Sequence, residues 1–183
     1  MTCPFCQKEH PYTISEAVSM LAAAPRRLEK LASAMSPRRA TNKPSPDKWS
    51  AKEIICHLAD CELVYGIRYR KILAEPTPAL VPFDQEAWAK NLQYQTQPLK
   101  SVVATFAALR NGHVSLFKSL PPEDWDKGGQ HPQYGALTLR QIVSHLVQHD
   151  LNHIAQVERL SPPPAKPRRK AVAKPKAKAR KTR

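Results

Sequence analysis

Three histidines near the C-terminal end have the spacing of metal ligands. His145, His149 and His153 follow one another at intervals of four residues, which places them on one face of a helix. At about 100° per residue, His149 and His153 lie within about 20° of Ile142 and Leu160, in the middle of an apolar stripe. His145 lies at the edge of that stripe. Two imidazoles that face a protein interior need partners, and one metal ion can satisfy both.

A further histidine has a similar orientation on an earlier helical segment. The apolar stripe of residues 51–74 includes Cys61, and His57 flanks it. Three imidazoles from two helices form a donor set that divalent Zn, Ni or Fe accepts, with positions left open for water or substrate. The sequence therefore predicts metal ligands at His57, His149 and His153 if the two helices are neighbours. The alternatives are histidines packed in a core without metal, and a closed structural site with Cys61 as fourth ligand.

The segment from His149 to His153 is also similar in spacing to the HExxH motif of zinc peptidases, in which the glutamate is the general base. Asp150 stands at the position of that glutamate. Its shorter side chain does not reach the same point, so we do not assign peptidase chemistry to this segment.

Helices must position these residues, and prolines and capping residues mark the helix limits. Ser50 with Glu53, and Thr138 with Gln141, form capping boxes. We expect long helices over about 14–35, 51–74, 99–120 and 139–160, and a short helix from Asp84 to Leu92. Pro25 either kinks the first helix or starts another segment.

Four helices of about 20 residues, with no convincing alternating stretch, predict an all-α four-helix bundle. The connections 36–49 and 75–98 are longer than ordinary hairpin loops, so at least one of them is expected to be a long crossover. A polar loop is expected between the last two long helices.

The charge of the chain is concentrated in its last residues. The 183 residues carry a formal net charge of +14, yet 10 of the 29 Lys and Arg and no acid lie in residues 161–183. This Lys/Ala/Pro-rich segment has little to bury and is predicted to be a disordered basic tail. Salt-dependent, non-specific binding of nucleic acid or another polyanion is one interpretation of the tail, and a merely solubilising segment is the other.

Three parts are thus expected: an N-terminal segment over residues 1–11, a helical bundle over 12–160 and the tail over 161–183. No apolar run approaches a membrane span and no secretory signal is visible, so a membrane partner is excluded and a cytoplasmic location is expected. Cys3 and Cys6 form a CxxC that, with His10, is either part of a zinc ligand set or a fortuitous feature of a flexible end.

Two long stretches resemble the DinB-like superfamily, the damage-inducible-type proteins and their YfiT-like relatives. They are WSAKEIICHLADCELVYGIRYRKILAE (Trp49 to Glu75) and GALTLRQIVSHLVQHDLNHIAQ (Gly135 to Gln156), and the shorter phrase FDQEAWA (Phe83 to Ala89) adds to the match. The resemblance covers residues 14–160. It implies a bundle with up-down-down-up topology, dimers in many members, and a metal triad on His57, His149 and His153.

The resemblance also implies candidate chemistry. Some relatives transfer bacillithiol or mycothiol, so the leading hypothesis is a metal-dependent thiol S-transferase whose partners are a low-molecular-weight thiol and a small electrophile. The alternatives are a metal-dependent hydrolase and a non-catalytic metalloprotein whose basic tail binds nucleic acid. Arg68 continues the inward stripe past His57, and we expect it to pair with Glu62 or another acid rather than to bind a carboxylate of the thiol.

Overall fold

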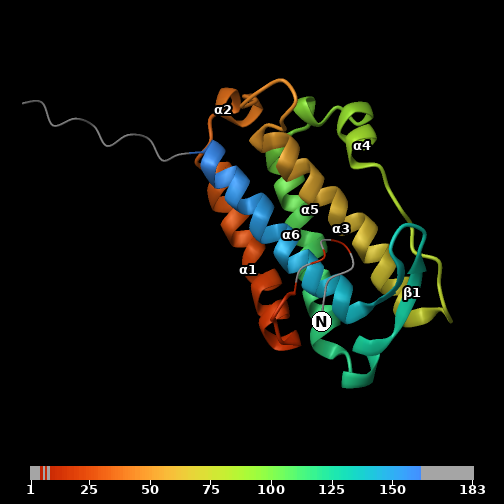
Figure 1. Ribbon diagram of the computed structural model, residues 1–183. Helices are drawn as coiled ribbons and strands as arrows, with labels where there is room; N and C mark the ends of the chain where they lie inside the picture. The colour runs from red at the N-terminus through yellow and green to blue at the C-terminus, as the bar shows by residue number, and fades with distance from the viewer. Residues whose placement is uncertain (1–4, 6, 8, 162–183) are drawn as a thin grey trace, which may run out of the picture.

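The computed structural model describes Phe5, Gln7 and residues 9–161 (Figure 1). Its long helices are α1 (Ile14–Ser33), α3 (Ala51–Ala74), α5 (Leu99–Ser119) and α6 (Leu139–Leu160). The shorter elements are α2 (Pro37–Thr41), α4 (Gln85–Asn91), the 3-10 helices η1 (Tyr94–Thr96) and η2 (Pro122–Asp126), and the strands β1 (Gly128–His131) and β2 (Gly135–Thr138). The predicted all-α four-helix bundle is confirmed.

Capping boxes fix the first residues of the two helices that carry the predicted ligands. The Ser50 amide donates to the Glu53 carboxylate over 2.7 Å, and the Glu53 amide donates back to Ser50 Oγ. Thr138 and Gln141 make the same reciprocal pair at the start of α6. Each cap of this kind stabilises a helix by about 1 kcal/mol. Pro25 was expected either to kink the first helix or to start another segment. In the structure α1 continues through Pro25 as one helix, so no second segment starts there.

The bundle has the up-down-down-up topology. α1 and α3 both pack against α5 and α6, so α1 lies diagonally opposite α3. α1 and α6 run in one direction and α3 and α5 run in the other (Figure 1). Residues 75–98 return along the length of the bundle before α5 begins, so they form the predicted crossover (Figure 1). α3 and α6 are neighbours, which is the condition that the metal-site prediction required.

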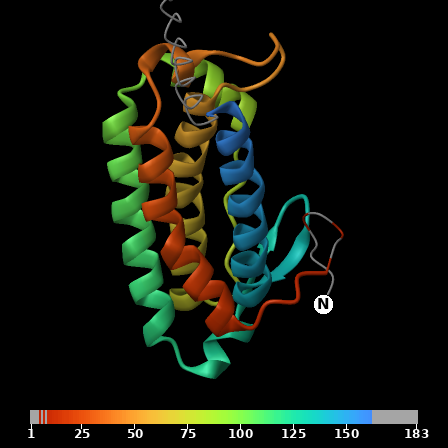
Figure 2. The same cartoon turned by 90° about the vertical axis from the view of Figure 1, so that its left-hand side faces the viewer.

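A small β-hairpin replaces the expected polar loop before α6. β1 and β2 pair antiparallel, from Gly128 opposite Thr138 to His131 opposite Gly135, and the hairpin lies beside α6 (Figure 2). Gly135 has φ of 68°, a left-handed conformation that glycine adopts without strain. Two strands of four residues are too short to show an alternating pattern in the sequence, which explains why the hairpin was not expected.

None of the helices in the described ranges is long and apolar enough to cross a membrane. Cys3, Cys6 and residues 162–183 lie outside the described residues, so the interpretations of the CxxC motif and of the basic tail stay predictions.

Candidate metal centre

The bundle brings the three predicted ligands together between α3 and α6. Nε2 of His57 lies 3.0 Å from Nε2 of His149. The ring centroid of His153 lies 5.0 Å from that of His57 and 4.4 Å from that of His149. The three rings therefore lie close together, although they come from positions up to 96 residues apart, but the ligand atoms that lie within 4.8 Å of one another belong to His57, Cys61 and His149 and not to His153. Their role as ligands remains a prediction.

Two of these imidazoles, those of His57 and His153, are in a protonation state that suits metal binding. Burial, with the neighbouring His149 and His153, lowers the pKa of His57 to about 2. Burial and His149 lower the pKa of His153 to about 4. Both rings are therefore neutral near pH 7, and a neutral imidazole is the form that donates a lone pair to a metal.

The hydrogen bonds around the rings also fit a metal. The amide oxygen of Gln156 accepts from Nδ1 of His153 over 2.9 Å, which leaves Nε2 of His153 unprotonated and free to ligate. Nδ1 of His149 and Oδ1 of Asp150 are both buried without a hydrogen bond among the described residues. Burial raises the pKa of the Asp150 carboxyl, but Arg110 and His149 together lower it by more than burial raises it. The pKa of Asp150 therefore lies below its usual value. Neutral rings at His57 and His153 beside a buried carboxylate are a donor set that fits a divalent cation.

Cys61 is a fourth candidate ligand. Its Sγ lies 3.5 Å from Nε2 of His57, and ligand atoms of His57, Cys61 and His149 all lie within 4.8 Å of one another. Burial is the largest cause that raises the pKa of the Cys61 thiol well above its usual value, with Glu62 and Asp150 adding to it. The thiol is therefore protonated unless a metal displaces its proton.

We expect Cys61→Ser to keep about one metal per chain, because three imidazoles suffice for an open site. Inductively coupled plasma mass spectrometry after reconstitution with Zn would measure this. Cys56→Ser is the matched control, since Cys56 is also buried on α3 but its Sγ faces the Tyr94 carbonyl. Loss of metal from the Cys61 variant alone would show a closed site with a thiolate ligand.

Two cavities flank the histidines. One of about 250 Å³ is lined by His57, His149 and Cys61 and extends to Arg68 and His131. The other, of about 490 Å³, is lined by His153 together with Trp49 and Gln156. The centre is thus accessible from the first cavity through two of its imidazoles and from the second through the third.

A buried cluster of charged residues joins α3, α5 and α6 next to the histidines. Arg110 of α5 forms two hydrogen bonds with the Glu62 carboxylate, at 2.9 and 2.7 Å, and an ion pair with Asp150. Nδ1 of His113 also lies 2.9 Å from Glu62. A Cβ at Gly66 would lie 2.5 Å from the His113 ring, so glycine lets α5 approach α3 here.

This cluster corrects one expectation from the sequence. Glu62 pairs with Arg110, whereas Arg68 donates to the carbonyl of Val81 and pairs with no acid among the described residues. Arg110 was missed as a functional residue. The signal was present, because Arg110 falls on the buried stripe that Phe106 and Val114 define on α5, where a charge needs a partner.

The remaining histidines of this region lie around the first cavity. His145 lines it and stacks on Phe5, with ring centroids 4.2 Å apart. His10 Nδ1 donates to the Ser144 carbonyl over 3.1 Å, which holds the N-terminal segment against α6. His131 was not considered as a site residue in the sequence, because it lies in a segment expected to be a loop.

Comparisons with known proteins point to one family. A family model described as the DinB superfamily matches residues 20–157. YfiT of Bacillus subtilis, named as a candidate metal-dependent hydrolase, is 26% identical over 145 residues, or 79% of this chain and 82% of YfiT. A protein of Oceanobacillus iheyensis with the same kind of name is 27% identical over 112 residues, which cover 61% of this chain and just under two thirds (64%) of that protein.

A solved structure supports the fold. The structure of YfiT, described as a probable metal-dependent hydrolase with an unusual four-helix bundle topology, superimposes with a TM-score of 0.78 at 24% sequence identity. The superposition covers 84% of this chain and 91% of the YfiT chain. At this identity the likeness shows the arrangement of helices and says nothing further about chemistry.

Proposed function

Because this chain belongs to the DinB superfamily, as its motifs predict, we propose that it is a metal-dependent enzyme with His57, His149 and His153 as metal ligands. We propose further that it transfers a low-molecular-weight thiol to small electrophiles. The observation that carries the proposal is the closeness of three imidazoles, of which His57 and His149 line a small cavity and His57 and His153 are neutral because burial lowers their pKa. A divalent metal such as Zn, Ni or Fe would supply a Lewis acid that lowers the pKa of a thiol or of water.

The residues around the cavity favour a thiol as the nucleophile. Among the described residues that line it there is no Ser, Thr, Lys, Asp or Glu, so none of them offers an aliphatic hydroxyl nucleophile or a carboxylate base. A thiol has a pKa of about 8.5 and needs little assistance to lose its proton at pH 7, whereas water, with a pKa near 15.7, needs much more. Hydrolysis, the activity in the names of the relatives, is the second candidate function.

In the proposed reaction the thiol loses its proton to solvent, its sulfur forms a bond to an electrophilic carbon, and the leaving group departs with the electron pair of the broken bond. The side chains of His57 and His149 line the end of the cavity where this reaction is proposed to take place. Phe5, Phe83 and Tyr134 contribute apolar walls that limit the access of water.

The test is a pair of activity screens on protein loaded with Zn, Ni or Fe. Glutathione, coenzyme A, bacillithiol and mycothiol would each be offered with 1-chloro-2,4-dinitrobenzene, and 4-nitrophenyl acetate would be offered without thiol. Conjugation above the non-enzymatic rate, lost in His149→Ala, supports thiol transfer. Ester hydrolysis without conjugation supports the hydrolase. Neither activity in protein that holds one metal per chain would contradict both functions in this form.

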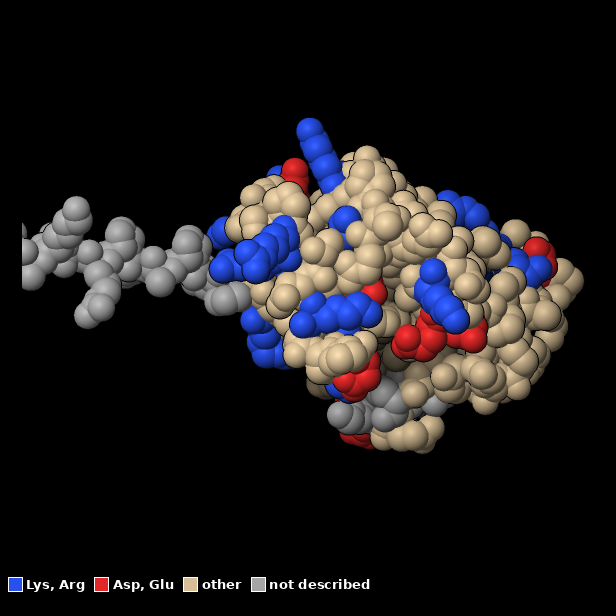
Figure 3. All heavy atoms as spheres, turned by 90° about the horizontal axis from the view of Figure 1, so that it is seen from above, with Lys and Arg blue, Asp and Glu red and all other residues tan. Residues whose placement is uncertain are grey.

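The basic tail is proposed to bind polyanions independently of the metal centre. Lys and Arg side chains also gather at the end of the bundle where α6 finishes (Figure 3). We expect that replacing all ten Lys and Arg of residues 161–183 by Gln weakens binding of a 20-base-pair DNA at least about tenfold at 50 mM salt, with a shallower salt dependence. Fluorescence anisotropy would measure both, and unchanged affinity would rule out the tail as the binding segment.

A further inference from the structure

Among the described residues, Arg68 is the only charged one that lines the cavity beside His57 and His149. The other lining residues are histidines, aromatic residues, glutamines and Cys61, and no carboxylate is among them. Arg68 is only 3% exposed. A buried guanidinium loses hydration that it must recover from other groups, and buried charges are normally paired with an opposite charge.

Within the described residues, the partners of Arg68 are neutral. Its Nε and Nη2 donate to the Val81 carbonyl at 3.0 and 2.6 Å, and Nη2 lies 3.2 Å from Nε2 of His131. Its guanidinium carbon lies 4.8 Å from the centre of the Tyr65 ring. The two bonds to Val81 hold the plane of the guanidinium in place, so its remaining edge is oriented before any ligand arrives.

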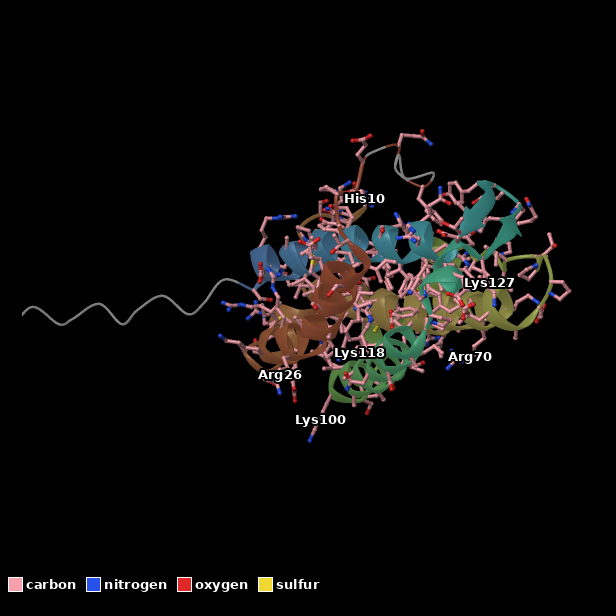
Figure 4. The ribbon with its side chains drawn as sticks, turned by 90° about the horizontal axis from the view of Figure 1, so that it is seen from below. His10, Arg26, Arg70, Lys100, Lys118 and Lys127 are labelled. Carbon is pink, nitrogen blue, oxygen red and sulfur yellow. The ribbon has the colours of Figure 1, made fainter. Side chains whose placement is uncertain are left out.

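The other arginines of the bundle show how unusual this arrangement is. Arg110, which is buried to the same degree, is neutralised by two carboxylates. Arg26 and Arg70 are exposed, and Nη1 of Arg70 donates to the Gly66 carbonyl on its own helix over 2.9 Å, while Lys100 points away from the bundle (Figure 4). Arg68 alone combines burial, a place on a cavity wall and the absence of an acid partner among the residues described.

His131 adds to the excess of donors at this end of the cavity. The backbone amide of Gln133 donates to Nδ1 of His131 over 3.2 Å, while Arg68 faces Nε2 of the same ring. A neutral imidazole carries one N–H, so one of these two contacts sets a donor against a donor. An acceptor in the cavity would relieve that conflict.

We propose that the Arg68 end of this cavity binds a carboxylate group of the small molecule on which the enzyme acts. The proposal rests on the proposed function, in which the opposite end of the same molecule reaches His57 and His149. Arg68 follows His57 by 11 residues, about 16 Å along α3, and helical side chains lean toward the N-terminus, so Arg68 leans toward the centre. With a volume of about 250 Å³, the cavity suits a short chain with a carboxylate at one end and the reacting group at the other.

The first experiment compares matched thiols on the Co(II)-loaded full chain. The probes are 3-mercaptopropionate and 6-mercaptohexanoate, with 3-mercapto-1-propanol and 6-mercapto-1-hexanol as their uncharged counterparts, and the visible spectrum of Co(II) reports binding. We expect one of the acids to bind about tenfold more tightly than its alcohol in the wild type. In Arg68→Met this preference is expected to disappear while the affinity for the alcohols stays the same.

Arg70→Met is the matched control, because Arg70 lies two residues further along α3 and is exposed. It is expected to keep the full preference. Equal binding of acids and alcohols by the wild type, or an unchanged preference in Arg68→Met, would overturn the proposal.

A metal-free measurement separates this proposal from the function on which it rests. In the apo full chain, the side-chain Nε–H resonance of Arg68 is expected to shift and saturate on titration with hexanoate, and to stay in place with hexanamide. This result supports the carboxylate site even if no thiol binds Co(II), and it does not depend on the folding of a variant. The absence of a shift, with thiols still binding Co(II), would overturn the carboxylate site and leave thiol transfer standing.

Discussion

His149→Ala should lose its metal almost completely, with affinity for Zn falling by more than about 100-fold. His149 lies next to both of the other imidazoles, with its Nε2 3.0 Å from Nε2 of His57 and its ring centroid 4.4 Å from that of His153. Removing it leaves two ligands on different helices. Changes to residues that merely support a ligand cost about 10–100-fold, so the loss of a ligand itself should cost more. Competition with a chromophoric chelator would measure the affinity.

His145→Ala is the matched control for this variant. His145 lies on the same helix four residues earlier, and its ring stacks on Phe5 instead of facing His57 and His153. It should keep about one metal per chain. If both variants bind Zn as tightly as the wild type, or if both lose it equally, the three-histidine centre is wrong.

Arg110→Met should lower the free energy of unfolding by about 3–5 kcal/mol, the usual cost of removing one partner from a buried ion pair. Methionine fills part of the space but leaves the carboxylates of Glu62 and Asp150 buried without their cation. Burial is the largest effect on the pKa of both carboxyls and raises it, while Arg110 lowers it. Without Arg110, we expect them to take up protons or to draw water into the bundle. Urea denaturation of the full chain at pH 7.5 would measure the change.

Arg140→Met provides the comparison, because Arg140 pairs with Asp126 at the surface over 3.2 Å. Exposed pairs contribute about 0–1 kcal/mol, so this variant should unfold close to the wild type. A loss below 1 kcal/mol in Arg110→Met would mean that the cluster is not energetically coupled to the fold.

The sequence predicted the features that depend on local spacing. The capping boxes at Ser50 and Thr138 set the starts of α3 and α6, because a cap is satisfied by residues three positions apart. The angular positions of His57, His149 and His153 on their helices also follow from spacing along the chain, and they predicted that all three rings face the interior. That α3 and α6 are neighbours could not be derived from spacing, because it depends on the direction of the crossover.

The features that the sequence reasoning missed depend on contacts between distant segments. Arg68 was expected to pair with Glu62, six residues earlier on the same helix, but these residues lie on different sides of α3. Glu62 faces α5, where Arg110 reaches it across 48 residues of sequence. Arg68 faces the crossover and the hairpin, where it contacts Val81 and His131. A helical projection already separates Arg68 from Glu62, but it does not show which distant segments each of them meets.

The crossover has a consequence for how the molecule folds. Because α1 packs against α6, part of the core forms only when the first and last long helices meet. Contacts between such distant segments slow folding, since the chain loses the conformational entropy of a long loop before these contacts can stabilise it. The contact between His57 and His149, which are 92 residues apart, is another contact between distant segments. A metal ion that binds only the completed arrangement would therefore stabilise finished chains over partly folded ones, so its availability would set the yield of native protein as well as its chemistry.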